Sequence, residues 1–509
     1  MYFLGYDIGS SSIKAALVDA SNLATVEVVH YPETEMDIIA RQSGWAEQQP
    51  EVWWGNLIHA TNKLFDKSKI NKQEVVSIGI SYQMHGLILL DKEQHVLRPA
   101  IIWCDSRAVG IGNQAFDDLG SEYCLRNLLN SPGNFTASKL KWVKDHEPEL
   151  YEQIDSVLLP GDFINFKLTG ELNTTVSGLS EGVFWDFKNN EISKSLMDFY
   201  GFDCSLIPNI VETIGLQGQL SAQAAEQLGL KKGTPVGYRA GDQPNNALSL
   251  NVLKPGEIAA TGGTSGVVFG VTDELIYDNE SRVNGFAHVN HRALDPRVGI
   301  LLCINGAGIQ YSWMRQMLAG SETSYNDLER MISSVPINSD GLMVFPFGNG
   351  AERMFQNQDI GSRVTHLNLN RHGKGHMFRA SLEGIAFSFI YGIEILKEIG
   401  MDVSKIKVGN DNLFQSNVFA KTISSVLGCE IEMLNATGAV GAAKAGAVGA
   451  GIFQKIEEAV GAQTVVHTYA PSADASQHIA GYGTWKSELQ NVLNSKREKV
   501  YSHEYHYRG

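Results

Sequence analysis

The sequence predicts an α/β protein with two large domains and a cleft between them. Its 509 residues exceed what one core usually supports, because domains commonly hold roughly 100 to 200 residues. The length alone also allows three smaller domains. Strand-like and helix-like patterns alternate along the chain, which is typical of α/β folds. A strand–turn–strand unit at the N-terminus returns about half the chain later, and this repeat favours two domains.

The repeated unit is a hairpin. Its first copy has a strand at 2–8, a turn of small residues at 9–12 and a second strand at 13–19. The second copy spans 256–271 around a Gly/Thr/Ser turn at 262–266. Short turns of this kind are common, so two unrelated hairpins are the alternative. If the copies are related, each half of the chain presents one turn of small residues to a ligand.

We expect strands and helices both before and after the second hairpin, and an irregular C-terminal end. The tail at 494–509 is polar and lacks apolar periodicity, so we expect it either to be frayed or to form a surface appendage. Its histidines face no opposing ligand cluster, which argues against a metal site there. The expected strands are 75–81, 87–90, 157–160 and 405–409, and the expected helices are 137–145, 148–153, 376–400 and 416–427.

The composition indicates a packed soluble protein. Hydrophobic residues make up 43% of the chain and charged residues 19%. Because 41 basic residues face 56 acidic ones, for a net charge of −15, nucleic acids and anionic membranes would be repelled, and we expect neither as a partner. A neutral sugar is not repelled, whereas nucleotide phosphates need backbone N–H groups, helix N-termini and a divalent metal. The oligomeric state stays open, with a homodimer as one option.

The chain shows no pattern for disulfides, export or membrane insertion. Five cysteines, odd in number and without C-x-x-C spacing, predict buried reduced thiols. The N-terminus has no basic leader and carries Asp7, which argues against a signal peptide and favours the cytoplasm. No apolar run reaches the roughly 20 residues of a spanning helix. The nearest, at 436–453, is rich in Ala and Gly and contains Lys444, so we expect a closely packed helix.

Asp242 is the candidate base for a phosphoryl transfer. Such a transfer needs a carboxylate to accept a hydroxyl proton, a cradle for the phosphates and a cation. Gly241 precedes Asp242 and Pro244 follows it, and because both interrupt regular structure we expect Asp242 on a loop. Locally, a turn-forming or helix-capping aspartate is the commoner explanation. The turn at 262–266, whose N–H groups and hydroxyls suit a phosphate, favours the base.

Two further segments carry candidate ligands. Asp7 precedes the turn at 9–12, and because an acid beside phosphates requires a cation between them, it is the candidate Mg²⁺ ligand, directly or through water. A capping aspartate is an equal alternative. The segment Gln83-Met84-His85-Gly86 places an amide, a thioether and an imidazole between two apolar strands, which predicts a polar pocket floor. A single histidine in such a run is, however, more often a satisfied core residue.

Together these segments resemble the FGGY carbohydrate kinases, and most closely their xylulokinase branch, from Phe3 to about Leu493. Gly5-Tyr6-Asp7-Ile8-Gly9-Ser10-Ser11 is similar to that family's first phosphate hairpin, and Gly263-Thr264-Ser265-Gly266 to its second. Gln83-Met84-His85-Gly86 is similar to the motif with which xylulokinases contact the sugar, and is the most specific match. Further matches are Trp45-Ala46-Glu47-Gln48, Trp103-Cys104-Asp105-Ser106-Arg107, Lys139-Leu140-Lys141-Trp142-Val143 and Leu158-Leu159-Pro160-Gly161-Asp162.

The resemblance implies an ATP-dependent kinase with two actin-like (ribonuclease H-like) ATPase domains, 1–245 and 246–493, a cleft between them and a polar tail, 494–509. It implies ATP and Mg²⁺ as cofactors, and Asp242 as the base that takes the proton from a terminal hydroxyl of a ketopentose, above all D-xylulose. The expected acceptor site comprises Gln83, Met84, His85, Asp242 and Gln243. The expected nucleotide contacts are Ser10, Ser11, Gly263, Thr264, Ser265, Asn412 and Ser416, and the expected metal ligand is Asp7.

Three positions depart from the family pattern. Gln243 stands where xylulokinases usually carry a sugar-binding asparagine. The segment at 408–416 replaces a run of glycines against which adenine and ribose pack, so we expect a crowded or reshaped floor. Leu367 replaces a glycine of the second signature. The alternatives are therefore a kinase for ribulose, gluconate or another polyol or sugar acid, and a catalytically weak sugar-sensing paralogue, which the presence of Asp242 disfavours.

Overall fold

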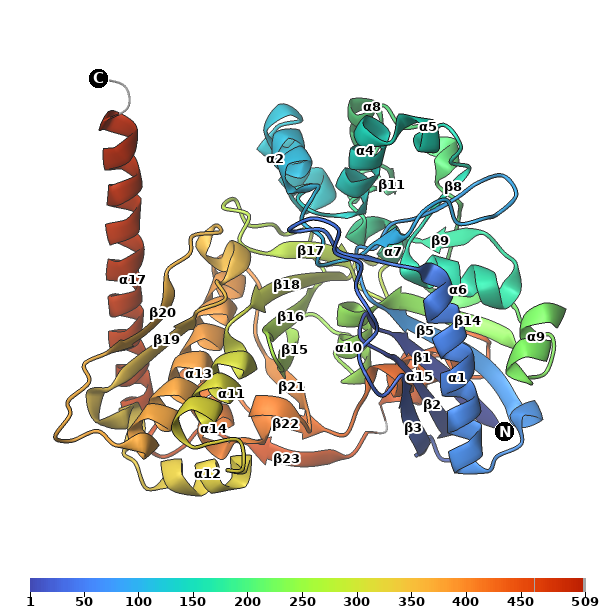
Figure 1. The fold of residues 1–509 in the computed structure, drawn as a ribbon. Helices are drawn as coiled ribbons and strands as arrows, with labels where there is room; N and C mark the ends of the chain where they lie inside the picture. The colour runs from blue at the N-terminus through green and yellow to red at the C-terminus, as the bar shows by residue number, and fades with distance from the viewer. Residues whose placement is uncertain (462, 507–509) are drawn as a thin grey trace.

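Two β-sheets organise the chain (Figure 1). The computed structural model describes residues 1–461 and 463–506. The first sheet has the strand order β13-β14-β5-β1-β2-β3 and the second β17-β18-β16-β15-β21-β22-β23. The first sheet comprises β1 (Tyr2–Ile8), β2 (Ile13–Asp19), β3 (Thr25–Tyr31), β5 (Val75–Tyr82), β13 (Ile214–Gln219) and β14 (Pro235–Gly241). The second comprises β15 (Glu257–Gly262), β16 (Gly266–Thr272), β17 (Asn284–Ala287), β18 (Val298–Ile304), β21 (Lys405–Gly409), β22 (Ile431–Leu434) and β23 (Val465–Tyr469).

The two sheets share one plan. In the first, β1 and β2 form an antiparallel hairpin extended by β3, and β5 and then β14 add parallel to β1 before β13 closes the edge antiparallel. In the second, β15 and β16 form the hairpin, β18 extends it, β21 and β22 add parallel and β23 closes antiparallel. The hairpins therefore occupy equivalent places. The repeat and the α/β class are confirmed, and β17 is an additional edge strand.

Helices cover both faces of the first sheet. One face carries α15 (Gly438–Gly449), which comes from the second half of the sequence. Its approach depends on missing side chains, because a Cβ at Gly79 would lie 1.9 Å from the carbonyl oxygen of Ala442. The opposite face carries α1 (Pro50–Ser68), which shares a buried apolar cluster with Leu4. The Ala/Gly-rich stretch is thus the closely packed helix that the sequence predicts.

The remaining elements agree with the expected alternation. Strands β5, β6, β8 and β21 and helices α4, α5, α13 and α14 begin and end within two residues of the predicted positions. The other helices that bear on the site or the packing are α6 (Pro160–Thr169), α7 (Val176–Glu181), α10 (Asp242–Ser249), α11 (Ala307–Leu318) and α12 (Tyr325–Ser333). Among the elements that the sequence predicted, the remaining bounds are β6 (Ile88–Leu90), β8 (Ser156–Leu158), α4 (Thr136–His146), α5 (Pro148–Tyr151), α13 (Lys374–Glu398) and α14 (Asn417–Leu427).

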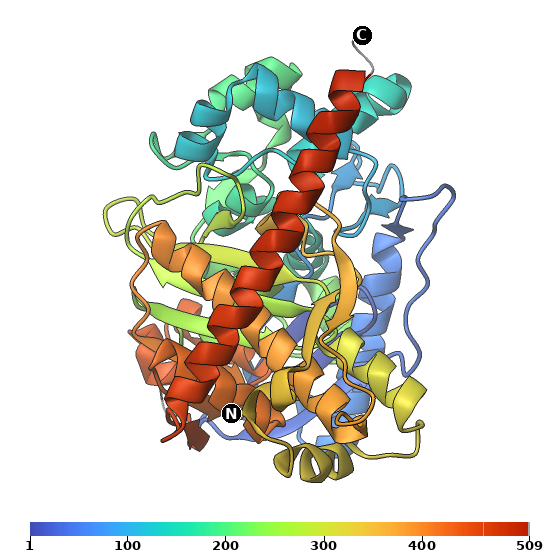
Figure 2. The same ribbon diagram turned by 90° about the vertical axis from the view of Figure 1, so that its left-hand side faces the viewer.

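The end of the chain is a long helix. Figure 2 shows α17 (Ala475–His506) as one continuous rod along the second domain. Trp485 and Leu489 in its first half are buried, and a helix nucleated by such packing extends readily through good helix formers such as Lys, Arg and Glu. The prediction of a frayed end is therefore wrong for 494–506, which continue α17, whereas a surface appendage stays a prediction and 507–509 lie outside the described residues.

The cysteines are all free, but not all are buried. Cys124 is buried and Cys303 and Cys429 are half-buried, whereas Cys104 and Cys204 are exposed. The expectation of buried thiols is wrong for the last two, because Cys104 lies in a surface turn and Cys204 begins a short exposed 3₁₀ helix, Cys204–Leu206. Among the described residues, no helix combines the length and apolar character needed to cross a membrane.

Candidate active site

Three adjacent parallel strands of the first sheet end at one edge, and the expected site residues follow them. The strands are β14, β5 and β1, which lie in register at their ends. Asp242 follows the first, Gln83 follows the second and Asp7 is the next-to-last residue of the third. Ligands of α/β proteins bind at the carboxyl ends of parallel strands. The topology therefore brings Asp7, Gln83 and Asp242 to one site.

Asp242 is the first residue of α10, directly after β14. The prediction that it lies on a loop between Gly241 and Pro244 is wrong. Pro244 is the third residue of the helix, and because N–H groups of the first turn have no partner within the helix, proline is tolerated there. The positive end of the helix dipole favours a carboxylate at this place.

The pKa of Asp242 is raised to about 7. Burial in the cleft is the larger cause, because desolvation disfavours the charged carboxylate, and the nearby charge of Asp7 adds repulsion. Hydrogen bonds from Gln243 and the charge of Lys14 act in the opposite direction. A carboxyl group that titrates near neutral pH is well placed to accept a proton in catalysis.

Asp7 offers its carboxylate to the cleft at the end of β1. Ser81 Oγ donates to Asp7 Oδ1 at 2.9 Å, and Lys14 Nζ lies 3.8 Å from Asp7 Oδ2. No cluster of three or more His, Cys, Asp or Glu ligands occurs within 1–461 and 463–506. A single carboxylate suits Mg²⁺, which in kinases usually keeps several waters and binds substrate phosphates.

His85 is held as a neutral ring. Its Nδ1 lies 2.9 Å from the carbonyl oxygen of Glu181, so Nδ1 must carry the proton and Nε2 is left as an acceptor. Burial, together with the charge of Lys139, lowers the pKa of His85 to about 3. The ring packs edge-on against Phe135 at 4.6 Å between centroids and tilts against Phe286 at 5.4 Å. Nε2 can therefore accept a hydrogen bond from a sugar hydroxyl.

Gln83 links the acceptor motif to the first hairpin. Its backbone N–H donates to Ile8 O at 2.8 Å, and its Nε2 lies 3.5 Å from Gln48 Oε1. Gln48 in turn donates from Nε2 to Ser10 O at 2.7 Å. The side chain of Gln48 thus connects the acceptor floor to the turn expected to hold a phosphate.

A buried carboxyl group lies beneath this floor. A Cβ at Gly241 would lie 2.4 Å from Glu181 Oε2 and 2.5 Å from Met84 Cγ, so Glu181 occupies the space behind Met84. Neither oxygen of Glu181 makes a hydrogen bond of ordinary geometry among the described residues, although the Tyr82 hydroxyl lies close enough to oppose the rise of its pKa. Burial and the charge of Asp242 raise the pKa of Glu181 well above its ordinary value, which favours the protonated form of this carboxyl.

A cavity of about 530 Å³ opens beside the second hairpin. The N-terminus of α11 holds the hairpin turn in place, with Gly308 N–H donating to Gly263 O at 2.9 Å and Ile309 N–H to Thr264 O at 3.1 Å. The cavity is large enough for a nucleoside. It is lined by Gly262, Gly263 and Thr264, by Gly308, Ile309, Tyr311 and Ser312 of α11, by Tyr325, Asn326 and Glu329 of α12, and by Asn412, Leu413, Gln415 and Ser416.

The two halves of the cleft face each other across these hairpins. Burial raises the pKa of Asp411 in the second domain, and the charge of Lys14 in the first domain opposes that rise. Lys14 is therefore close enough to act on carboxylates of both domains, including Asp242. A phosphate chain that spans the two turns would pass this lysine.

The floor of the cavity differs from a glycine run in two ways. Leu413 closes over the second hairpin, since a Cβ at Gly262 would lie 3.0 Å from Leu413 Cβ. Ser416 is the N-cap of α14, and its Oγ donates to Glu329 Oε2 at 2.7 Å. The hydroxyl proton of Ser416 is thus already engaged, whereas Asn412, held at φ +58°, lines the cavity.

The remaining expected nucleotide contacts lie outside this cavity. Ser10, Ser11 and Ser265 are not among its lining residues. Ser10 Oγ accepts a hydrogen bond from Trp103 Nε1 at 3.2 Å, and Ser11 O accepts one from Met36 N–H at 2.8 Å. These serines belong to the tips of the hairpins, so their expected role is with phosphates rather than the nucleoside.

Two protein-family models match the chain. The N-terminal domain model of the FGGY family of carbohydrate kinases matches residues 2–249, and the C-terminal domain model matches residues 258–450. The chain belongs to this family. A xylulose kinase from Bacillus subtilis (strain 168) is 29% identical to it over 98% of this chain and 97% of its own length. An L-xylulose/3-keto-L-gulonate kinase from Escherichia coli (strain K12) is 29% identical over 90% of each chain.

A solved structure shares the fold of this chain. The crystal structure of xylulose kinase from Rhodospirillum rubrum matches with a TM-score of 0.86 at 24% identity, covering 97% of this chain and 99% of that one. The FGGY kinase thus has the expected actin-like ATPase architecture. It is a carbohydrate kinase, a transferase that uses ATP and a sugar.

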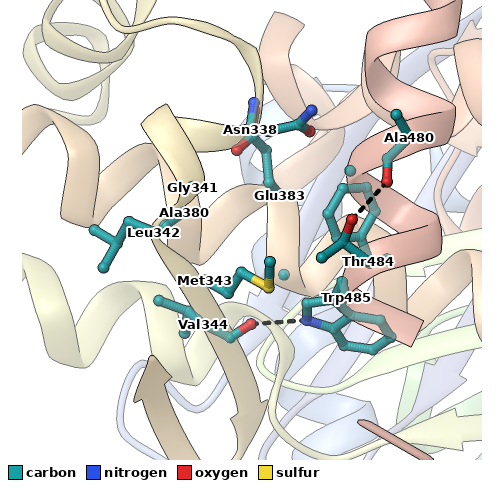
Figure 3. A pocket seen from close by; sticks show the side chains of 13 residues that line it. Asn338, Gly341, Leu342, Met343, Val344, Ala380, Glu383, Ala480, Thr484 and Trp485 are labelled. Carbon is teal, nitrogen blue, oxygen red and sulfur yellow. Dashed lines mark hydrogen bonds between the residues drawn. The ribbon is translucent and has the colours of Figure 1, made fainter. Parts of the chain in front are cut away.

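A second cavity of this FGGY kinase has one buried polar atom in its wall, Asn338 Oδ1, without a hydrogen-bond partner among the described residues. It measures about 220 Å³ and lies between α13 and α17 (Figure 3). Glu383 in its wall accepts from Ser339 Oγ at 2.8 Å and pairs with Arg379 Nε at 2.8 Å. Trp485 Nε1 donates to Val344 O at 3.0 Å. The bonds of Trp485 and of Asn338, whose Nδ2 donates to Gln477 O at 2.7 Å, hold α17 against the domain, so the cavity is a packing feature.

Sequence reasoning missed three residues that the structure places at the site. Gln48 belongs to a matched motif, but nothing in its spacing shows that it bridges Gln83 and the first turn. Glu181 and Glu329 lie in no motif, and only the tertiary structure brings them to the acceptor floor and the nucleotide cavity.

Proposed function

We propose that this FGGY kinase transfers the γ-phosphoryl group of ATP to a terminal hydroxyl of a ketopentose, D-xylulose, and releases D-xylulose 5-phosphate. The observation that carries the proposal is the position of Asp242, a carboxyl with a pKa near 7 at the carboxyl end of β14, beside the Met84–His85 floor. The xylulose kinases among its relatives support the choice of acceptor.

The acceptor would lie against Met84 and His85, with Gln243 beside the base. Asp242 would take the proton from the hydroxyl as its oxygen attacks the γ-phosphorus, while neutral His85 accepts a hydrogen bond at Nε2 and so orients the chain. General base catalysis of this kind contributes roughly 100- to 10,000-fold in rate.

The nucleotide would occupy the cavity beside the second hairpin, with its phosphates between the two turns. Lys14 would stabilise negative charge that develops during transfer. Mg²⁺, held at Asp7 through water and by the phosphates, would supply charge neutralisation there. Closure of the two domains would exclude water and limit futile hydrolysis of ATP.

The acceptor is tested by coupled ADP release with D-xylulose, L-xylulose, D-ribulose, L-ribulose, gluconate and glycerol at equal concentrations. The proposal expects the highest kcat/KM for D-xylulose. If another of these six compounds gives a higher kcat/KM, that compound is the acceptor instead of D-xylulose, and the proposed kinase mechanism still holds. If no member is turned over while sugars still raise the melting temperature, the chain is a sugar-sensing paralogue instead.

A further inference from the structure

Arg353 carries a guanidinium group from the second domain against Gly133 and Phe135 of the first domain. It lies in a short 3₁₀ helix, Glu352–Phe355, after β19 (Met343–Phe347). Its Cζ lies 5.5 Å from the ring centroid of Phe135 in the first domain, and its Nη2 would lie 2.7 Å from a Cβ at Gly133. Absence of a side chain at Gly133 therefore makes room for the arginine.

Contacts connect this arginine to the acceptor floor. The ring of Phe135, over which Arg353 lies, packs edge-on against His85. The charge of Arg353 contributes to the lowered pKa of His85, and Arg353 and Asp242 both act on Cys303 of β18. The guanidinium is thus close enough to affect the pKa of His85 on the acceptor floor. It also affects the pKa of the Cys303 thiol, on which the charge of Asp242 acts as well.

A hydrogen bond holds the guanidinium of Arg353 in place but satisfies few of its donors. Its Nη1 donates to Ser281 Oγ at 3.2 Å, which uses one of five N–H donors on the guanidinium. Burial lowers the pKa of Arg353 to about 10, with the charge of Glu352 opposing, so the group stays charged at neutral pH. Glu352 is a non-glycine residue at φ +43°, and strained backbone of this kind concentrates at functional sites.

We propose that Arg353 is a specificity-determining residue of the acceptor site, which donates hydrogen bonds from the second domain to oxygens of an open-chain sugar bound against His85. The inference rests on the proposed sugar phosphorylation and adds a residue to it. An open-chain sugar bears an oxygen on every carbon, and the planar guanidinium can donate to two of them at once. Because the arginine and His85 belong to different domains, acceptor binding favours the approach of the two domains.

The test compares Arg353→Met, which removes the donors at similar length, with Arg353→Lys, which keeps the charge. Hydrogen bonds to charged groups correspond to roughly 10- to 100-fold in affinity, so Arg353→Met should raise KM for the ketose by that factor, and KM for ATP by no more than about two-fold. Arg353→Lys should recover part of the ketose affinity. An unchanged ketose KM, or equal rises in both KM values, would overturn the inference.

Two controls separate recognition from structural support. Ser281→Ala removes the hydrogen bond between Ser281 and the guanidinium but leaves the N–H donors of Arg353 in place. This variant can melt lower than the wild type, but its KM for the ketose should not rise. Arg363→Met changes an exposed arginine of β20 (Gly361–Thr365), whose Nε donates to Ile360 O at 3.1 Å, and should leave both KM values unchanged.

Calorimetric titration of the wild type and Arg353→Met with the same six acceptors, without ATP, distinguishes this inference from the proposed function. If the wild type binds a sugar without turning it over, phosphorylation fails as the function, and weaker binding by Arg353→Met still supports the inference. Equal binding by both proteins, including no binding by either, overturns it.

Discussion

Replacing Asp242 with asparagine should inactivate the kinase and stabilise its fold. Asparagine has nearly the same shape and can keep the start of α10, but it cannot accept the hydroxyl proton. Turnover should fall by roughly 100- to 10,000-fold, the range usual for loss of a general base, while the affinity for the sugar changes little.

The gain in stability follows from the raised pKa of Asp242. The pKa rises from 3.8 to about 7, and one unit corresponds to about 1.4 kcal/mol, so the ionised carboxylate costs up to about 4 kcal/mol in the folded state. Because the folded pKa is raised, this cost is absent below the ordinary pKa, grows between about pH 4 and pH 7 and is constant above that. The partly exposed side chain makes 4 kcal/mol an upper value.

Scanning calorimetry and coupled ADP release on the same preparations test both effects. At pH 8, without nucleotide or metal, Asp242→Asn should melt higher than the wild type by at least about 3 °C, and the difference should vanish towards pH 4. Gly55→Ala, which changes a neutral residue of α1 with open space around it, provides a control without this pH dependence. Near-normal turnover, or a melting difference independent of pH, would refute the assignment of Asp242 as a buried base.

Three further results are expected. The value of kcat/KM should rise through an ionisation near pH 7 because Asp242 acts in its deprotonated form, and a profile flat from pH 5.5 to 8 would contradict that. Glu181→Gln keeps the size of the side chain, and because burial raises the pKa of Glu181 and disfavours its charge, this variant should keep kcat within about five-fold. Glu181→Ala leaves a cavity and should lower the free energy of unfolding by roughly 2 kcal/mol in urea titration. Strong inactivation by the glutamine variant alone would show that the acid itself is needed. Gly79→Ala should separate α15 from the first sheet and cost roughly 1 to 3 kcal/mol in the same titration, whereas Gly55→Ala on the open side of α1 should cost nothing.

Local patterns in the sequence determined much of this protein. Alternating apolar residues and small-residue turns sufficed to predict both hairpins, and their repetition predicted the duplicated sheets. The chemistry of the Gln83–Gly86 segment predicted a polar pocket floor, and the phosphate turn at 262–266 together with the resemblance to FGGY kinases made Asp242 the candidate base. The error at Asp242 came from treating Pro244 as a breaker, when the first turn of a helix accepts proline.

Only the tertiary structure decided which distant groups share the site. Glu181 reaches the floor because α7 ends behind Met84, and Arg353 arrives from the second domain at a gap left by Gly133. The pKa of Asp242 depends on its burial and on Asp7, which is far away in sequence. Periodicity reports which face of an element is buried, but electrostatic and packing interactions act through space, and so the charge state and specificity of the site could not be read from the order of its residues.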